Sequence, residues 1–231
     1  MELSAHSSGV HIIAVEQIIL ATLMAKSKLP KDMSLMAQLS ADSYLPLRRR
    51  KGVQGWTYVP EQSTTYHAIY YQDDGNRAVV ANRGTKPTHV ADLQQDLNII
   101  LGQGDKSSRV KTAVRIGKRV ERQTGREVTY TGHSLAASIG YFAGRTHKRP
   151  SYNFNMGSSP AQLLKETGRM VKCEAGFEGE CLDDETNKNT HVFHNRNDPL
   201  SVASYYYQAQ HHETPSKWTN WDAHGLDQFI S

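Results

Sequence analysis

The 231-residue sequence has no apolar run long enough to cross a bilayer, no internal repeat and no low-complexity linker. Its longest apolar stretch, residues 10–24, is interrupted by His11, Glu16 and Gln17 and is shorter than the roughly 20 residues that a spanning helix needs. The 3.6-residue spacing of its apolar positions predicts a helix packed on a core, with a surface anchor as the alternative. The N-terminus lacks the charged region and cleavage site of a secretory signal peptide.

Cysteine is scarce, because Cys173 and Cys181 are the only two. Their spacing matches no metal-site pattern, so we predict no metal site, and no motif in the chain calls for a cofactor. A small disulfide loop and two free thiols both fit this pair. Two free thiols are the preferred interpretation, since nothing marks the chain as secreted. For the same reason a cytoplasmic or peripheral-membrane location is favoured.

The net charge is also small, because 27 basic and 23 acidic side chains leave a formal charge of +4. This composition is typical of a soluble globular protein, and the length predicts one α/β domain over residues 1–231 with an N-terminal helical segment at 1–50. The mild basicity suits an anionic surface such as phospholipid but names no partner. The run at residues 48–51 is interpreted as a solvated turn, and no nucleic-acid partner is predicted.

Strand and helix patterns alternate through the rest of the chain. Strand formers at 66–72 and 77–82 flank the turn residues 73–76 and predict a hairpin. Helices are expected at 33–45, 107–123 and 135–145, with a short helix or turn at 92–101. Further strands are expected at 127–131, 152–156 and 190–195. The order predicts a largely parallel sheet with an antiparallel edge.

The expected helix over 107–123 has cap signals at both ends, with Ser107 or Ser108 at its start and Gly125 after it. Its apolar positions predict a buried face. The other face is expected to be solvated and is the main source of basicity: Arg109, Lys111, Arg115, Lys118, Arg119 and Arg122.

The most informative segment is residues 130–137, in which the expected strand ends at Thr131 and the expected helix begins after Ser134. A serine held on a sharp strand-to-helix turn is typical of a nucleophile elbow. There the backbone N–H groups of the first helical turn stabilise developing negative charge. Taken alone, Ser134 is equally explained as a helix cap.

A serine nucleophile needs a base, and the base needs an orienting acid. Asp198 follows the expected strand 190–195 and His224 lies near the C-terminus, which gives the chain order Ser, Asp, His of this architecture. Turn and surface roles are the structural alternatives for these two residues. Competing acids and histidines stand elsewhere: Asp183, Asp184, Asp222, Asp227, His191, His194, His211 and His212.

Five motifs in order make the chain resemble class 3 lipases, the α/β-hydrolase group of the fungal triacylglycerol lipases. They are residues 79–85 with 92–98, 132–135, 155–160, 197–200 and His224. The resemblance implies an α/β-hydrolase fold with a mostly parallel central sheet flanked by helices. It implies Ser134 as nucleophile, His224 as base, Asp198 as orienting acid, and an oxyanion hole at Thr85 and Leu135.

The sequence departs from this pattern at three places. Ala136 and Ala137 replace a double glycine, Asn82 replaces an aromatic residue that would border the pocket, and the segment at 86–91 is less apolar than a lid. We therefore expect a serine ester hydrolase acting on lipids, of triacylglycerol lipase or phospholipase A type, with contact to a membrane surface as a further expectation. A catalytically silent binding or structural protein is the alternative. The sequence indicates no oligomeric state.

Overall fold

We describe the protein from a computed structural model, covering residues 29–84, 104–177, 179–195, 197–198, 201–214 and 225–230. The expected helices at 10–24 and 92–101, and the motif at 86–91, lie outside these ranges. None of the described helices is both long and apolar enough to pass through a membrane.

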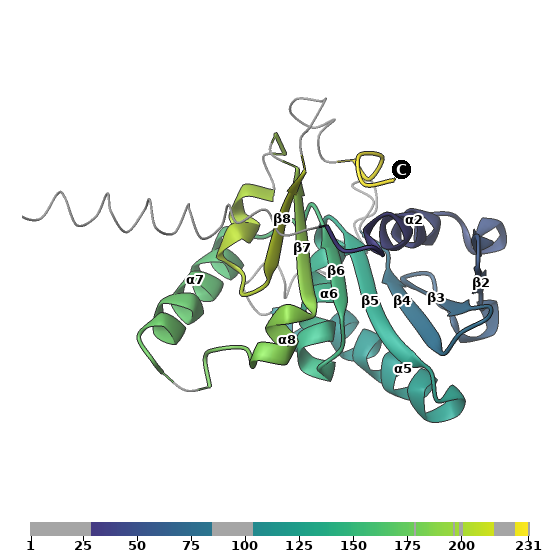
Figure 1. The fold of residues 1–231 in the computed structure, drawn as a ribbon, viewed down its shortest axis with the longest axis horizontal. Helices are drawn as coiled ribbons and strands as arrows, with labels where there is room; N and C mark the ends of the chain where they lie inside the picture. Colours follow the sequence, from purple (N-terminus) through teal and green to yellow (C-terminus); the bar gives the residue numbers. More distant parts are fainter. Residues whose placement is uncertain are drawn as a thin grey trace, which may run out of the picture.

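The centre of the fold is an eight-stranded sheet whose spatial order follows the order of the chain (Figure 1). The first four strands pair antiparallel, and β4 through β8 pair parallel. The strands are β1 (Gly52–Val53), β2 (Trp56–Tyr58), β3 (His67–Gln72), β4 (Arg77–Asn82), β5 (Glu127–His133), β6 (Ser151–Phe154), β7 (Thr190–Asn195) and β8 (Gln210–Thr214). This arrangement confirms the predicted fold class.

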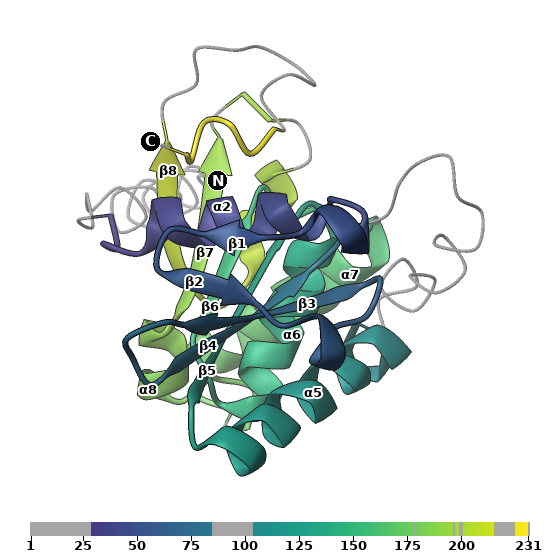
Figure 2. The same ribbon diagram turned by 90° about the vertical axis from the view of Figure 1, so that its right-hand side faces the viewer.

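Helices cover both faces of the sheet (Figures 1 and 2). Helix α2 (Met33–Ser43) lies on one face over a core that includes Phe154, Phe193 and Phe229. Helices α5 (Ser108–Thr124) and α6 (Leu135–His147) lie on the other face over a second core. Helices α7 (Pro160–Glu174) and α8 (Asp184–Lys188) precede β7. The short 3-10 helices are η1 (Leu47–Arg49), η2 (Pro60–Gln62), η3 (Gly104–Lys106) and η4 (Ser201–Tyr206).

Helix α5 has the predicted caps, because Ser107 accepts from the backbone N–H of Arg109 and Gly125 adopts the left-handed conformation with φ 69°. Its predicted solvated face is wrong at one residue. Arg109 is 3 % exposed, its guanidinium donates to the carbonyl oxygen of Arg83, and it lies 4.8 Å from the ring centroid of Tyr66. The first turn of α5 is thus pinned to the end of β4.

The basic run at residues 48–51 is also only partly solvated. Arg48 and Arg49 are exposed, but Arg50 is 5 % exposed. Its guanidinium donates to the carbonyl oxygens of Leu45, Thr64 and Thr65. Those bonds satisfy the buried charge and tie the turn to the strand β3 side of the sheet.

Cys173 and Cys181 form a disulfide, so the preferred interpretation of two free thiols is wrong. The bridge joins the last turn of α7 to the loop before α8. Gly176 and Gly179 in that loop have φ values of 82° and 89°, which glycine adopts without steric cost. The loop can therefore fold back over the eight-residue separation and bring the two sulfurs together.

Candidate active site

Ser134 sits at the sharp turn between β5 and α6, as predicted. Its backbone has φ 60° and ψ −131°, a conformation that a residue with a side chain rarely adopts. The turn is held by hydrogen bonds from the N–H of Ser134 to the carbonyl oxygen of Phe154 at 3.0 Å and from the N–H of Ala137 to that of Ser134 at 3.0 Å. Strain at a single buttressed residue is typical of functional sites.

Small residues make the turn sterically feasible. A Cβ placed on Gly132 would lie 2.3 Å from the carbonyl oxygen of Ala136, so the first turn of α6 packs directly on the strand backbone. Ala136 and Ala137 are fully buried in the core on that face. The two alanines that replace the expected glycines are thus accommodated, and the contact that excludes a side chain falls at Gly132.

The loop after β6 lies against the Ser134 turn. The N–H of Gly157 donates to the carbonyl oxygen of Ser134 at 3.3 Å, and a Cβ on Gly157 would lie 4.0 Å from the Oγ atom of Ser134. Ser138 donates to the carbonyl oxygen of Gly157 at 2.8 Å, and the hydroxyls of Ser158 and Tyr207 are 2.7 Å apart. This loop forms one wall beside Ser134 and is fixed from two other elements.

Asn155, which the sequence did not single out, joins three strand-end segments. It is fully buried and has φ 42°, a left-handed conformation that asparagine tolerates better than most residues. Its Oδ1 accepts from the N–H of Asn195 at 3.0 Å, and its Nδ2 donates to the carbonyl oxygen of Gly225 at 3.4 Å. Gly225 directly follows His224 in the chain, so Asn155 holds the segment around Gly225 at the edge of the sheet where the Ser134 turn lies.

Other contacts secure the same segment. The side chain of Asn195 donates to that of Gln228, and the Phe229 ring packs 5.1 Å from the Phe154 ring, centroid to centroid. His224 itself lies outside the described residues, as do Thr85 and Asp222. The structure therefore places the residue after His224 at this edge and leaves the positions of His224 and Thr85 as predictions.

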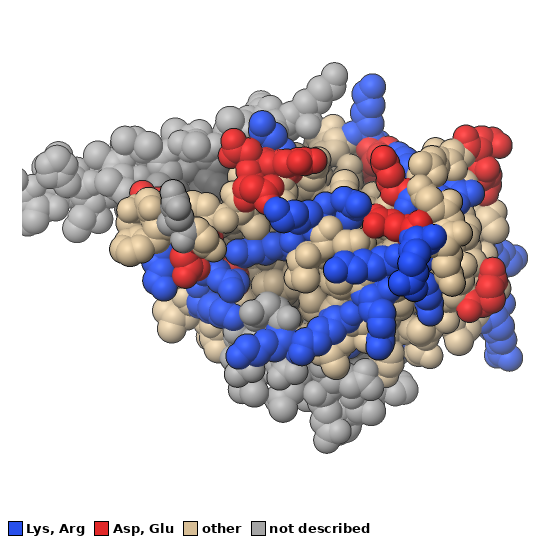
Figure 3. Space-filling model, turned by 90° about the horizontal axis from the view of Figure 1, so that it is seen from below, with Lys and Arg blue, Asp and Glu red and all other residues tan. Residues whose placement is uncertain are grey.

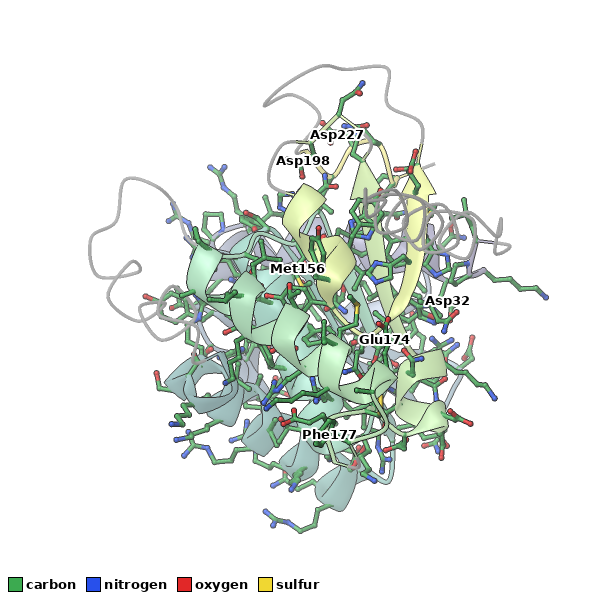
Figure 4. The ribbon with its side chains drawn as sticks, turned by 90° about the vertical axis from the view of Figure 1, so that its left-hand side faces the viewer. Asp32, Met156, Glu174, Phe177, Asp198 and Asp227 are labelled. Carbon is green, nitrogen blue, oxygen red and sulfur yellow. A yellow bond between two sulfur atoms is a disulfide. The ribbon has the colours of Figure 1, made fainter. Side chains whose placement is uncertain are left out.

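Asp198 lies just beyond β7 and is fully buried. Its N–H donates to the carbonyl oxygen of Asn195 at 3.0 Å, which forms a tight turn at the strand end. Figure 4 shows Asp198 and Asp227 at the end of the molecule where β7 and β8 finish, far from Glu174 and Phe177. One strand, β6, separates β5 from β7, so the two strand ends are about 10 Å apart, which leaves room for a bridging side chain.

The competing acids Asp183 and Asp184 are at the opposite edge, because they begin α8 and α8 precedes β7. Asp183 accepts from the N–H of Thr186 at 2.8 Å, and this bond, together with Lys148, lowers its pKa to about 2. It is a helix cap with a surface ion pair. Neither acid is near Ser134.

The competing histidines form two pairs that cross from β7 to β8. The ring nitrogens of His191 and His212 are 3.1 Å apart, and those of His194 and His211 are 2.7 Å apart. Burial lowers the pKa of His191 and His212 to about 4 and also lowers that of His211. These side chains have packing roles, as predicted for His191 and His194. Among the described residues, no group of three or more His, Cys, Asp or Glu side chains could hold a metal ion.

Near the Ser134 turn, the side chain of Asn82 links β4 to its two neighbouring strands by hydrogen bonds. It is fully buried, its Oδ1 accepts from the ring N–H of His67 at 2.9 Å, and its Nδ2 donates to the carbonyl oxygen of Thr131 at 3.1 Å. Burial lowers the pKa of His67 to about 4, and the nearby Arg109 and Arg50 act in the same direction. Asn82 therefore joins three neighbouring strands, β3, β4 and β5, through its side chain.

Tyr44, at the end of α2, is a further residue that sequence reasoning missed. Its hydroxyl donates to the carbonyl oxygen of His133 at 3.1 Å, next to Ser134. A Cβ on Gly84 would lie 2.2 Å from the same hydroxyl, so β4 also ends against Tyr44. The contact joins residues 89 positions apart, and no local pattern predicts it.

Comparisons with solved structures find lipases and esterases. The Lip2 lipase from Yarrowia lipolytica is 12 % identical with a TM-score of 0.45, and the match covers 79 % of this chain and 78 % of that one. An esterase from Pyrobaculum calidifontis is 13 % identical with a TM-score of 0.40, and the match covers 99 % of this chain and 92 % of that one. A search of curated proteins gives no match.

A family model gives the assignment. The model described as "Phospholipase-like: Tle-like phospholipase domain" matches residues 24–202, which include Ser134 and Asp198. That span covers most of the chain, and it supports a lipase-like ester hydrolase. The chain therefore belongs to the Tle-like phospholipase domain family.

Proposed function

We propose that the protein is a serine ester hydrolase that cleaves the acyl ester of a phospholipid. The observation that carries the proposal is the geometry of Ser134, which has a left-handed backbone at the end of β5 and the N-terminus of α6 behind it. This turn exposes a serine hydroxyl beside the unpaired N–H groups of a first helical turn. A plain helix cap does not need that conformation, and the Ser134 side chain makes no capping hydrogen bond.

In the proposed reaction His224 takes the proton from the Ser134 hydroxyl, and the oxygen attacks the ester carbonyl. Asp198 orients the imidazole and stabilises its charged form. The oxyanion accepts hydrogen bonds from the backbone N–H groups of Leu135 and Thr85. The alcohol leaves with the proton from His224, and water then releases the fatty acid from Ser134 by the same steps in reverse order.

Support for the residue roles comes from the strand ends. Asp198 lies two strands from Ser134 at the same edge, and Asn155 places the neighbour of His224 there. The buried position of Asp198 suits an acid that orients a base without reaching solvent. The finer resemblance to class 3 lipases is consistent with these roles.

The choice of phospholipid over triacylglycerol follows the family to which the chain belongs. A phospholipase A releases one fatty acid and a lysophospholipid. The measurement is fatty-acid release from mixed vesicles of phosphatidylcholine and phosphatidylglycerol, compared with release from emulsified triacylglycerol. Faster turnover of the emulsion would overturn the phospholipid assignment while leaving the hydrolase assignment intact.

The test of the nucleophile is Ser134→Ala, assayed with a p-nitrophenyl ester and with a fluorophosphonate probe. We expect loss of about 10³-fold or more in kcat and no labelling, because removal of a triad nucleophile leaves only the oxyanion site and binding. Ser108→Ala is the control, since Ser108 is an exposed serine at the start of α5 and its loss should leave labelling unchanged. Equal rates in wild type and Ser134→Ala would refute the enzyme and leave the silent lipase-like protein, the second hypothesis.

A further inference from the structure

The outer face of α5 carries a hollow of about 560 Å³ that is separate from the nucleophile edge. Val110 and Val114 lie at its floor, being 1 % and 8 % exposed, and Thr146 of α6 borders it. Its remaining lining is entirely cationic: Lys111, Arg115, Lys118, Arg119 and Arg122. Figure 3 shows Lys and Arg side chains gathered over this face, with acidic side chains toward its margins.

The cations of this basic groove follow the helix in a straight row. Lys111, Arg115, Lys118 and Arg122 are exposed and are spaced by four, three and four residues, which places them on one side of α5 over about 17 Å. Arg119 is partly covered and donates to the carbonyl oxygen of Gln62 at 3.2 Å. The row therefore presents a regular series of positive charges above an apolar floor.

No carboxylate of the described residues pairs with these four exposed cations. Glu121, on the same helix, is turned away to Arg149 at 2.6 Å and to His147 at 3.3 Å. Like charges one turn apart repel one another by a few tenths of a kcal/mol per pair. The fold keeps this repulsion in the isolated chain, and an anionic partner would relieve it.

We propose that the basic groove binds an acidic polypeptide segment of a partner protein. Acidic side chains spaced at one helical turn would meet the four cations, while an apolar side chain between them would enter the hollow over Val110 and Val114. Charge complementarity of this kind gives specificity and fast association. The proposal does not depend on the hydrolase function, since the groove and Ser134 share no residue.

The arrangement favours a polypeptide over the other anionic macromolecules. A bilayer is flat and would not fill the hollow on α5. A bilayer at α5 would also lie away from the strand ends that carry Asp198, because α5 lies at the bottom of the view in which β7 and β8 end at the top (Figure 1). Single-stranded nucleic acid is bound by aromatic platforms between cations, and the groove has no aromatic lining residue.

The test is binding of the full chain to a fluorescein-labelled peptide that carries Glu at helix positions i, i+4, i+7 and i+11 with Leu between them. The comparison probes are a peptide of the same composition in scrambled order, a short DNA duplex, and vesicles of phosphatidylcholine and phosphatidylglycerol. The groove variant is Lys111→Glu with Lys118→Glu. Its control is Arg48→Glu with Arg49→Glu, which changes the net charge equally at another exposed site.

We expect the ordered peptide to bind at least about tenfold more tightly than the scrambled one, and the groove variant to lose about tenfold or more in affinity. The control variant should bind as wild type does, and esterase activity should be the same in all three proteins. Equal binding of both peptides, or equal loss in both variants, would overturn the proposal. Tighter binding of the duplex or of the vesicles that depends on Lys111 and Lys118 would also overturn it. So would self-association of the chain, measured by light scattering, that is lost in the groove variant.

Discussion

The buried side chain of His67, which bonds to Asn82 near the Ser134 turn, makes the stability of the fold depend on pH. His67 is 2 % exposed, and burial lowers its pKa to about 4 from an ordinary value of 6.5. A histidine whose folded-state pKa is lowered stabilises the fold fully above about pH 6.5, and that contribution is lost as the pH falls, because the unfolded chain binds the proton first. Integrated between about pH 7 and pH 5, this single group lowers the free energy of unfolding by about 2 kcal/mol.

The perturbation is His67→Gln, which keeps a side-chain N–H for Asn82 and removes the titration. Urea unfolding at about pH 7 and about pH 5 gives the free energy of unfolding at each pH. We expect the loss between them to be about 2 kcal/mol smaller in the variant than in wild type. The wild-type loss will exceed that of one histidine, since the pKa values of His191 and His212 are lowered to about 4 by the same cause.

Thr64→Ala is the matched control. The Thr64 hydroxyl accepts from the N–H of His67 at 3.1 Å, so its removal lowers stability by about 1 kcal/mol at both pH values and leaves the difference unchanged. Equal losses in wild type and His67→Gln would refute the reasoning. A difference that disappears in high salt would point to general charge repulsion instead of burial.

Two further predictions concern the site edge and α7. In Asn155→Ala and Asn155→Gly we expect kcat on a p-nitrophenyl ester to fall about tenfold with little change in KM, because both variants lose the hydrogen bonds to Asn195 and Gly225. Glycine suits the left-handed backbone at this position. Full kcat in Asn155→Gly would therefore show that the hydrogen bonds do not position the C-terminal segment. Replacing Cys173 and Cys181 together by Ser should lower the free energy of unfolding by about 2.5 kcal/mol, from the loop that the bridge closes. Thermal unfolding measures this, and a reductant should lower the Tm of wild type but not of the double variant; equal Tm values for the two proteins without reductant would contradict it.

The sequence predicted best those elements that are marked by both composition and boundaries. Strands β4 and β7 begin and end where expected, because a β-rich run is followed by a break in each case. Helix α5 was framed by Ser107 and Gly125. The strand before Ser134, the small residues after it and the strand before Asp198 were likewise visible, since all are local patterns.

The remaining features depend on contacts between distant residues. The sequence of strand β8 is polar, and its buried His212 and half-buried His211 find their hydrogen-bonding partners on β7. Helix α7 reverses the usual pattern, with Gln162 and Glu166 buried and Leu164 76 % exposed. Glu166 is stabilised by Arg169 at 2.9 Å and Arg145 at 3.5 Å, and hydrophobic periodicity cannot reveal such a buried ionic cluster.

The linear order of the eight strands has a consequence for how the protein is made. Each strand pairs with the one synthesised just before it, so the sheet can grow by addition while the ribosome is still at work. The Ser134 turn is complete once β6 has been added, whereas Asp198 and the segment around Gly225 are synthesised later. An unfinished chain would hold the proposed nucleophile without its acid or base. Under the proposed mechanism, a cell that makes this protein is exposed to its activity only after the segment around Gly225 has docked.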